Sequence, residues 1–313
     1  MKVSVIGQGY VGLNLAVNAS KSHNVYGYDL DEKKISSLIS KKSYIEDVTN
    51  GDLESALNSG NFNPTLDETY LSDSDIYVIC VPTPLDDSRN PDLTFIEQAC
   101  DLINRVCSKG ALVINESTSY PGTLRDFIRP RILKNKKEKF YFAVAPERVD
   151  PGRIDFTSSN TPRILSGIDE RSTLLASEFY SSFNAKMVIV DTPEVAETAK
   201  LFENTFRQVN IALVNELALI CGKLNIDVYK VLSAAASKPY GFMQFRPGAG
   251  VGGHCIPVDP TYLAQTAEKV GASAEFIRLA NKVNSEMPKK IVEKCAELTD
   301  GLYGKEVLIV GVS

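Results

Sequence analysis

The chain opens with a short apolar run that leads directly into three glycines at a fixed spacing. Lys2–Ile6 is followed by the loop Gly7-Gln-Gly-Tyr-Val-Gly12, and a helical pattern begins inside this loop. A strand that turns tightly into a helix presents backbone N–H groups at the helix N-terminus, with no side chains in the way of a pyrophosphate. The N-terminal part is therefore predicted to be a Rossmann domain that binds a dinucleotide.

The next strand indicates which dinucleotide is expected. Val25–Tyr28 ends at Asp29, where a carboxylate accepts hydrogen bonds from the adenosine ribose hydroxyls and repels a 2′-phosphate. NAD is therefore predicted rather than NADP, and Asp31 is a second candidate for the same role. A further contact is expected at Thr83, between two prolines that follow the strand Ile76–Cys80. The predicted cofactor contacts are Gly7, Gln8, Gly9, Tyr10, Val11, Gly12, Asp29, Asp31, Lys34 and Thr83.

Short β-branched runs alternate with amphipathic stretches in the first half of the chain, which predicts an α/β fold with a doubly wound parallel sheet. From Pro193 the strand pattern stops, and Glu194–Leu224 reads as one long helix. We therefore expect an NAD-binding domain over 1–192 and an all-helical central domain over 193–300. The remaining strands are expected at Leu112–Asn115, Phe140–Val144, Arg163–Ser166 and Met187–Val190. The later helices are expected at Asp227–Ala236, Pro260–Val270 and Ala274–Leu298.

The last residues contain one more apolar run. Glu306–Val310 is predicted to be a buried strand, and the chain stops three residues later. A strand with nothing after it implies a further α/β domain, of which 301–313 would be only the beginning.

Charge and cysteine usage limit the expected partners and compartment. Lys and Arg number 34 against 39 Asp and Glu, for a net charge of −5, so no nucleic-acid partner is expected. The apolar run at Val3–Ile6 is too short for a signal peptide or a membrane span, which predicts a cytoplasmic protein with no membrane partner. The six cysteines lack CxxC spacing, so we expect reduced thiols, five of them buried, and no metal site.

Several longer motifs follow one another along the chain. They are GQGYVG at Gly7–Gly12, CVPTP at Cys80–Pro84, ESTSYPGT at Glu116–Thr123, APERVDPG at Ala145–Gly152, AKLFENTFRQVNIALVNE at Ala199–Glu216 and GVGGHCIPVDP at Gly250–Pro260. With these motifs, in this order, the sequence resembles the UDP-glucose/GDP-mannose dehydrogenases, which oxidise the C6 alcohol of a nucleotide sugar to a carboxylate with two NAD.

The resemblance assigns a covalent role to Cys255. This cysteine lies in a glycine-rich loop, so its thiol is expected to face a ligand rather than a core. A thiolate that adds to an aldehyde forms a thiohemiacetal, which yields a second hydride and leaves a thioester for hydrolysis.

Other catalytic roles follow from the same motifs. Lys200 and Asn204 lie one helical turn apart, and the resemblance implies that they stabilise the substrate oxygen and position the sugar. Glu147, Thr118 and Asp259 are implied in proton handling and water positioning, and Thr118 also in the cofactor site. Asp259 is alternatively a helix N-cap before Pro260, and both roles are compatible.

Arginines are expected to bind the substrate diphosphate, because their planar fork suits phosphate oxygens. Arg246 is the leading candidate, beside Arg148 and Arg153. The resemblance implies that Arg246 can serve a neighbouring subunit in a homodimer built on the long central helix. The predicted substrate contacts are Glu147, Arg148, Lys200, Asn204, Arg246 and Gly252.

The loop around the cysteine indicates the sugar. Glucose-specific relatives commonly have Pro-Lys-Asp after the cysteine, whereas this chain has Pro257-Val258-Asp259, with His254 before the cysteine. Together with SKPYGFMQF at Ser237–Phe245, this favours a UDP-N-acetylhexosamine of the gluco, galacto or manno type, for surface polysaccharide synthesis. Two alternatives stay open: a two-electron 3-hydroxyacid dehydrogenase of the 6-phosphogluconate type, and a truncated NAD-binding protein without full activity.

Overall fold

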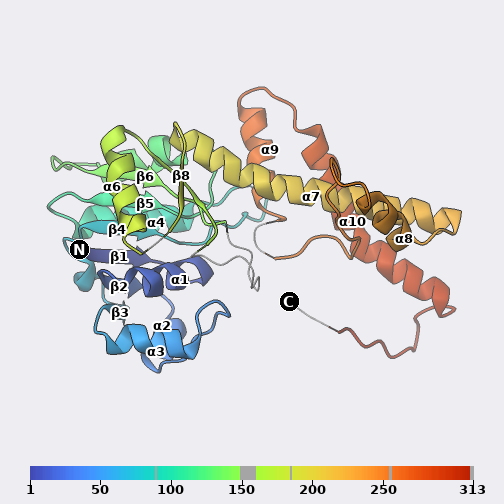
Figure 1. The fold of residues 1–313 in the computed structure, drawn as a ribbon, viewed down its shortest axis with the longest axis horizontal. Coiled ribbons are helices and arrows are strands. Elements are labelled where there is room, and N and C mark those ends of the chain that lie inside the picture. Colours follow the sequence, from blue (N-terminus) through green and yellow to red (C-terminus); the bar gives the residue numbers. More distant parts are fainter. Residues whose placement is uncertain (89, 149–159, 184, 254–255, 311–313) are drawn as a thin grey trace. The chain divides into compact units, whose positions relative to one another are not determined.

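The computed structural model describes residues 1–88, 90–148, 160–183, 185–253 and 256–310 (Figure 1). Contacts between residues divide the chain into two units. We call Met1–Asp86 with Pro91–Lys200 the Rossmann unit, and Asp87–Asn90 with Leu201–Ser313 the helical unit. This division falls inside the long helix, after Lys200, whereas the sequence pattern predicts a domain boundary before that helix.

The Rossmann unit is built on an eight-stranded sheet with the order β3-β2-β1-β4-β5-β6-β7-β8. The six strands from β3 to β6 run parallel, β7 pairs antiparallel with β6, and β8 runs parallel to β7. The strands are β1 Lys2–Ile6, β2 Asn24–Tyr28, β3 Phe62–Thr65, β4 Ile76–Ile79, β5 Leu112–Asn115, β6 Tyr141–Val144, β7 Arg163–Gly167 and β8 Met187–Ile189.

Helices join these strands and continue into the second unit. In the Rossmann unit they are α1 Tyr10–Ala19, α2 Glu32–Ile39, α3 Asn50–Asn58, η1 Glu68–Leu71, α4 Thr94–Val106, η2 Thr123–Ile128, α5 Arg129–Ile132 and α6 Glu170–Ser181. Then follow α7 Pro193–Leu224, which contains the division between the units, and α8 Val228–Ala236, α9 Asp259–Lys269 and α10 Glu275–Leu298. Among the described residues, no helix combines the length and apolarity needed to cross a membrane.

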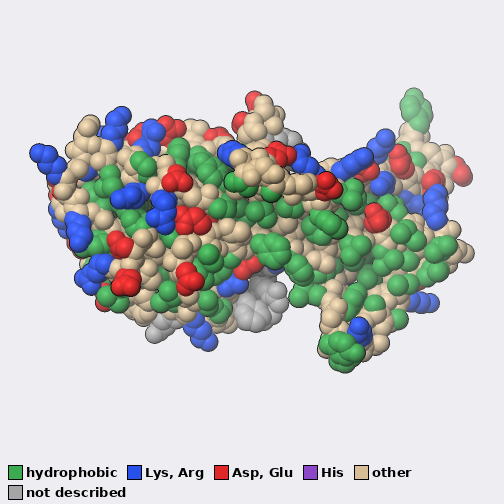
Figure 2. Space-filling view, turned by 90° about the horizontal axis from the view of Figure 1, so that it is seen from above, with side chains coloured by type: hydrophobic (Ala, Val, Ile, Leu, Met, Phe, Trp, Pro, Cys, Tyr) green, Lys and Arg blue, Asp and Glu red, His purple; other side chains and the backbone are tan. Residues whose placement is uncertain are grey.

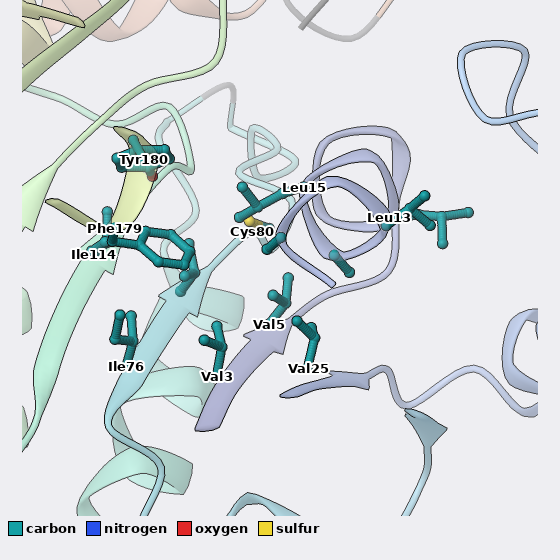
Figure 3. Close-up of a cluster of buried hydrophobic side chains, with 14 of the residues drawn as sticks. Val3, Val5, Leu13, Leu15, Val25, Ile76, Cys80, Ile114, Phe179 and Tyr180 are labelled. Atoms are coloured by element: carbon teal, nitrogen blue, oxygen red, sulfur yellow. The ribbon is translucent and has the colours of Figure 1, made fainter. Parts of the chain in front are cut away.

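The central strands are covered on both faces. Every residue of β4 and of β5 is buried, as expected for strands between two helical layers. On one face, side chains of β1, β2, β4 and β5 meet those of α1 and α6 (Figure 3). On the other face α4 packs against β4, with α5 beside it. The predicted α/β fold with a helical second part is therefore confirmed.

Several local expectations were wrong. The edge strand β3 was missed because it has only four residues and contains Pro64, which is tolerated at a sheet edge. The sheet is not wholly parallel, because β7 turns back against β6.

The strand predicted at Glu306–Val310 does not form. Its apolar side chains are 64–87% exposed, since no neighbouring strand within the described residues is available to pair with it. One predicted burial also fails, because the thiol of Cys295 lies exposed on α10.

Candidate functional site

The glycine loop after β1 has the shape that a bound pyrophosphate requires. Gly7 adopts φ +94°, and a Cβ there would approach the Cys80 carbonyl oxygen within 2.5 Å. A Cβ on Gly12 would overlap the carbonyl oxygen of Gly7, so the loop and α1 pack closely only with glycine. A Cβ on Gly9 would instead meet no heavy atom within 4 Å.

The open side of this loop fits an anion. Gly9 is the N-cap residue of α1 and provides no side-chain cap for the first turn. Backbone N–H groups and the positive end of the helix dipole therefore face the space beside Gly9, where Tyr10 and Val11 begin the helix. These residues fit the pyrophosphate of a dinucleotide.

Asp29 is held in place at the end of β2. Its carboxylate accepts from the Gln8 backbone N–H at 2.7 Å, from the Lys34 ammonium at 3.1 Å and from the Asp31 N–H at 3.0 Å. The side chain of Asp29 remains 12% exposed. Asp31 instead caps α2 by accepting from the Lys33 N–H at 2.9 Å. The structure therefore ties Asp29, and not Asp31, to the glycine loop.

The side chain of Gln8 lies beneath the loop rather than beside its open face. It is fully buried and donates to the Val5 carbonyl at 3.0 Å. The backbone carbonyl of Gln8 accepts from the Tyr44 hydroxyl at 2.5 Å. Burial, with Asp29 and Asp31 nearby, raises the pKa of Tyr44, so this hydroxyl stays protonated and able to donate.

The remaining predicted residues of the Rossmann unit follow neighbouring parallel strands. Thr83 comes after β4, Thr118 after β5 and Glu147 after β6. The carboxyl ends of parallel strands meet at one edge of the sheet, and the glycine loop and Asp29 follow β1 and β2 at this same edge. Thr83, Thr118 and Glu147 are each partly exposed there.

Glu147 belongs to a network of charges. Its carboxylate accepts from the Arg163 guanidinium at 2.5 Å and from the Arg148 N–H at 2.7 Å. The Arg148 guanidinium donates to the Pro162 carbonyl at 2.9 Å. Arg163 also pairs with Glu116 at 3.0 Å. Of the two arginines in this network, sequence reasoning had singled out only Arg148.

Lys200 is buried near the N-terminal end of α7, with an exposure of 8%. One turn earlier, Glu197 accepts from the N–H groups of Gly122 at 2.6 Å and Leu124 at 3.0 Å. Burial raises the pKa of Glu197 to about 8, although these two N–H groups favour its charged form. Glu197 therefore joins the start of α7 to the segment that follows Thr118.

In the helical unit, the structure brings two predicted residues together. The Asn204 amide donates to the Asp259 carboxylate at 2.5 Å, and their residue exposures are 9% and 3%. Asp259 is the first residue of α9, whose N-cap is Val258 without a side-chain cap. The alternative role of Asp259 as N-cap is therefore wrong, because its carboxylate bonds to Asn204 in α7 instead.

A cluster of buried amides holds the glycine-rich segment that precedes Cys255. Asn215 of α7 donates to the Asn284 side-chain oxygen at 3.0 Å and accepts from the Gly248 N–H at 2.8 Å. The Asn284 amide donates to the Gln208 carbonyl at 3.1 Å. Gly250 has φ +99° and would clash with the Asn284 carbonyl if it carried a Cβ. Asn215 and Asn284 thus fix where this segment leaves the helices.

Two other predicted substrate contacts of the helical unit, Arg246 and Gly252, lie on the surface. Arg246 is exposed, and the neighbouring Phe245 ring packs edge-on against Phe206 with centroids 6.0 Å apart. Gly252 is exposed, and a Cβ on it would meet nothing within 4 Å. His254, Cys255 and Arg153 lie outside the described residues.

Sequence reasoning missed four buried polar residues near these positions. They are Glu116, Arg163, Tyr180 and Glu197, each exposed by less than 4%. A signal existed for Glu116, an acid directly after a buried strand, and for Glu197, an acid three residues before Lys200 on one helix. The pairing of Arg163 and Tyr180 with Glu116 joins positions that are distant in the sequence.

Two family descriptions match the chain. Residues 1–184 match the NAD binding domain of the UDP-glucose/GDP-mannose dehydrogenase family, and residues 194–286 match the central domain of that family.

The chain is also similar to individual proteins. It is 37% identical to the UDP-N-acetyl-D-glucosamine 6-dehydrogenase of Salmonella typhi, over 99% of this chain and 74% of that protein. It is 36% identical to the UDP-N-acetyl-D-mannosamine dehydrogenase of Methanocaldococcus jannaschii, over 100% of this chain and 71% of that protein. The structure of the UDP-D-ManNAc dehydrogenase from Pyrococcus horikoshii superposes with a TM-score of 0.87 at 35% identity, covering 96% of this chain and 72% of that one.

Proposed function

The chain belongs to the UDP-glucose/GDP-mannose dehydrogenase family, and we propose that it oxidises the C6 alcohol of a UDP-N-acetylhexosamine to the carboxylate. Its cofactor is NAD, as the matched NAD binding domain shows. NAD, when bound, accepts a hydride in each of the two oxidation steps. The N-acetylhexosamine is supported by the relatives from Salmonella typhi and Methanocaldococcus jannaschii, whose names give such substrates.

The observation that carries the proposal is the buried pair of Asn204 and Asp259. An amide held by a carboxylate has one orientation, so Asn204 presents its carbonyl oxygen to a sugar hydroxyl in a defined direction. Lys200, one turn before Asn204, supplies a positive charge for the oxygen that becomes negative in the reaction.

Cys255 carries the covalent step in this proposal. After the first hydride leaves C6, the Cys255 thiolate adds to the aldehyde carbon and forms a thiohemiacetal. Loss of the second hydride leaves a thioester, and water then breaks the C–S bond to release the acid and the thiol. The balance is one alcohol, one water and two NAD consumed, with one carboxylate, two NADH and three protons formed.

Glu147 and Thr118 act on the water in the hydrolysis step. Glu147 lies partly exposed after β6, at the carboxyl end of the sheet, and its carboxylate is the proposed acceptor of a proton from water. Thr118 follows the adjacent strand and offers a hydroxyl to orient that water or the cofactor. Arg148, Arg153 and Arg246 are the proposed ligands of the substrate diphosphate.

The long helix supports a homodimer. Phe202, Phe206, Leu213, Ile220 and Leu224 are 41–62% exposed. At 100° per residue they fall within about 40° of arc on α7. Figure 2 shows hydrophobic side chains gathered on one face of the helical unit. A continuous apolar stripe of this kind favours burial against a second copy of the chain.

The proposed compartment is the cytoplasm, because both NAD and nucleotide sugars are cytoplasmic metabolites.

The number of NADH formed per sugar tests the function. Purified protein is mixed with excess NAD and a limiting amount of the gluco, galacto or manno UDP-N-acetylhexosamine, with UDP-glucose as control. Two NADH per sugar consumed are expected with one of the three, and one NADH per sugar would indicate the two-electron alternative. Retained NAD binding without turnover on any sugar would indicate the truncated, inactive alternative.

The Cys255→Ser variant tests the covalent step separately. It is expected to lose formation of the acid, because an alkoxide derived from serine does not form a thioester. Full turnover by this variant would contradict the covalent mechanism.

A further inference from the structure

Arg163 lies between two carboxylates inside the Rossmann unit. One guanidinium nitrogen, Nη1, donates to Glu116 Oε1 at 3.0 Å, and the other, Nη2, donates to Glu147 Oε2 at 2.5 Å. The side chains of Arg163 and Glu116 are exposed by 4% and 0%, whereas that of Glu147 is exposed by 11%. Glu147 is thus the most solvent-exposed member of this group.

Tyr180 of α6 completes the group. Its hydroxyl donates to Glu116 Oε1 at 2.5 Å, and its ring centroid lies 5.2 Å from the Arg163 guanidinium carbon. Arg163 is therefore restrained by a carboxylate and by an aromatic face, in addition to its bond to Glu147. Figure 3 shows Tyr180 beside the buried core that lies over the sheet.

The single positive charge of Arg163 lies between the buried carboxylate of Glu116 and the partly exposed carboxylate of Glu147. Burial raises the pKa of Glu116 to about 7, and the Glu147 charge acts in the same direction, while Arg163 and the Tyr180 hydroxyl oppose both. The second oxygen of Glu116, Oε2, has no hydrogen-bond partner in the part of the chain that the structure describes. Cys80 is a further titratable neighbour of Glu116. Its burial and the charge of Glu116 raise the pKa of the Cys80 thiol and keep it neutral.

We propose that Arg163 is a positioning residue for Glu147 in the hydrolysis step, and that Glu116 and Tyr180 hold Arg163 and set how much of its charge Glu147 receives. This inference rests on the proposed function, because it gives Glu147 the role of accepting a proton from water. An ionised Glu116 shares the charge of Arg163 and leaves Glu147 more basic. A neutral Glu116 leaves the whole charge to Glu147 and makes it a weaker base.

The Glu116→Gln variant tests this arrangement. Its side chain has the same shape and no charge, so Glu147 faces Arg163 alone at every pH. We expect the steady-state rate of this variant to match the wild type below about pH 7, where Glu116 is already neutral in the wild type, and to fall about tenfold above it. The initial burst of two NADH per active site keeps its rate, because hydride transfer precedes hydrolysis.

Tyr180→Phe is the milder second variant, and it guards against a Glu116→Gln protein that fails to fold. Loss of one hydroxyl is expected to change the same hydrolysis rate in the same direction by a smaller factor. Tyr77→Phe is the matched control, because Tyr77 is equally buried. Its hydroxyl donates to the Leu71 carbonyl at 2.7 Å, near the amino end of β4 and not at the carboxyl end of the sheet. Its pH profile is expected to match the wild type.

The outcomes distinguish a failure of the proposed function from a failure of the positioning role of Arg163. If wild-type protein forms no NADH with any UDP-sugar, the proposed function fails and this inference fails with it. If the wild type is active but Tyr180→Phe and any folded Glu116→Gln protein behave like Tyr77→Phe, the function stands and the positioning role of Arg163 is wrong.

Discussion

Asn204 in α7 and Asp259 at the start of α9 are joined by a hydrogen bond of 2.5 Å, although 55 positions separate them in the chain. Both residues are buried, and their hydrogen bond fixes the orientation of the amide relative to the carboxylate. An amide and a carboxylate held in this way suit the proposed roles of positioning the sugar and handling a proton.

Loss of this pair is expected to slow the reaction strongly. Asn204→Ala leaves the buried carboxylate of Asp259 without this donor, and we expect kcat to fall about 100-fold or more with a stability loss of about 1–3 kcal/mol. Steady-state rates and urea unfolding measure the two effects. Asn210→Ala is the matched control, because the Asn210 amide donates to the Phe206 carbonyl of its own helix at 2.7 Å rather than to a carboxylate of another helix. Equal rates in both variants would contradict a role for the pair.

Two glycines of the cofactor loop are expected to respond differently to alanine. Gly9→Ala places a methyl group in open space, so folding is expected to be unchanged while NAD affinity falls about tenfold or more. Gly12→Ala forces the loop apart against the Gly7 carbonyl, so both stability and NAD affinity are expected to fall. Thermal unfolding with and without NAD separates the two cases. Unchanged NAD binding by Gly9→Ala would place the pyrophosphate elsewhere.

Asp29 is expected to decide between NAD and NADP. Removal of its charge in Asp29→Ser should raise the Kd for NAD and lower the Kd for NADP, changing the ratio about tenfold or more, because the carboxylate no longer repels a 2′-phosphate. Titrations with each cofactor measure this ratio. Asp31→Asn keeps a side chain that can cap α2 and is expected to leave the ratio unchanged. A similar change in both variants would mean that Asp31 shares the role.

The amides of Asn215 and Asn284 are expected to act as one unit that positions the segment before Cys255. Each single change to alanine should lower kcat. Asn215→Ala removes the acceptor of the Gly248 N–H, and Asn284→Ala removes the acceptor that orients the Asn215 amide. The kcat of the double variant should be close to that of the slower single variant. The coupling energy between the two changes is expected to be about 0.5–3 kcal/mol. Strictly additive effects in this double-mutant cycle would show that the two amides act independently.

Glu197 is expected to make stability depend on pH. Its pKa is raised by burial to about 8, so the folded chain holds this proton where the unfolded chain has already lost it. Its contribution to stability is therefore fully present below about pH 4.5 and is lost as pH rises towards 8, at up to about 1.4 kcal/mol per pH unit. Urea unfolding between pH 5 and 8 should show this slope, and Glu197→Gln should lack it. Parallel pH profiles for the two proteins would show that Glu197 is already ionised in the folded state.

The cofactor half of the site was predicted most completely, because its signals are local. Gly7, Gly9 and Gly12 lie in the short loop after β1 and the first turn of α1, and Asp29 directly follows β2. Because β1 and β2 are parallel neighbours, this spacing alone places them together at the carboxyl edge of the sheet. The chemistry at Glu147 is different. Its partner Arg163 lies on a strand that reverses direction beside β6, and no local pattern indicates that reversal or the pairing it creates.

The sequence by itself determined the Rossmann motif, the preference for NAD, the long helix and the candidates for the reactive residues, because each depends on short-range spacing and side-chain chemistry. The tertiary structure decided which buried charged groups contact one another and which amides hold the glycine-rich segment. Glu116 meets Arg163 and Tyr180, and Asn215 meets Asn284, only after strands and helices pack. Inside a protein, the energy of a polar group depends on the partners that folding brings to it, and these partners are remote in the chain.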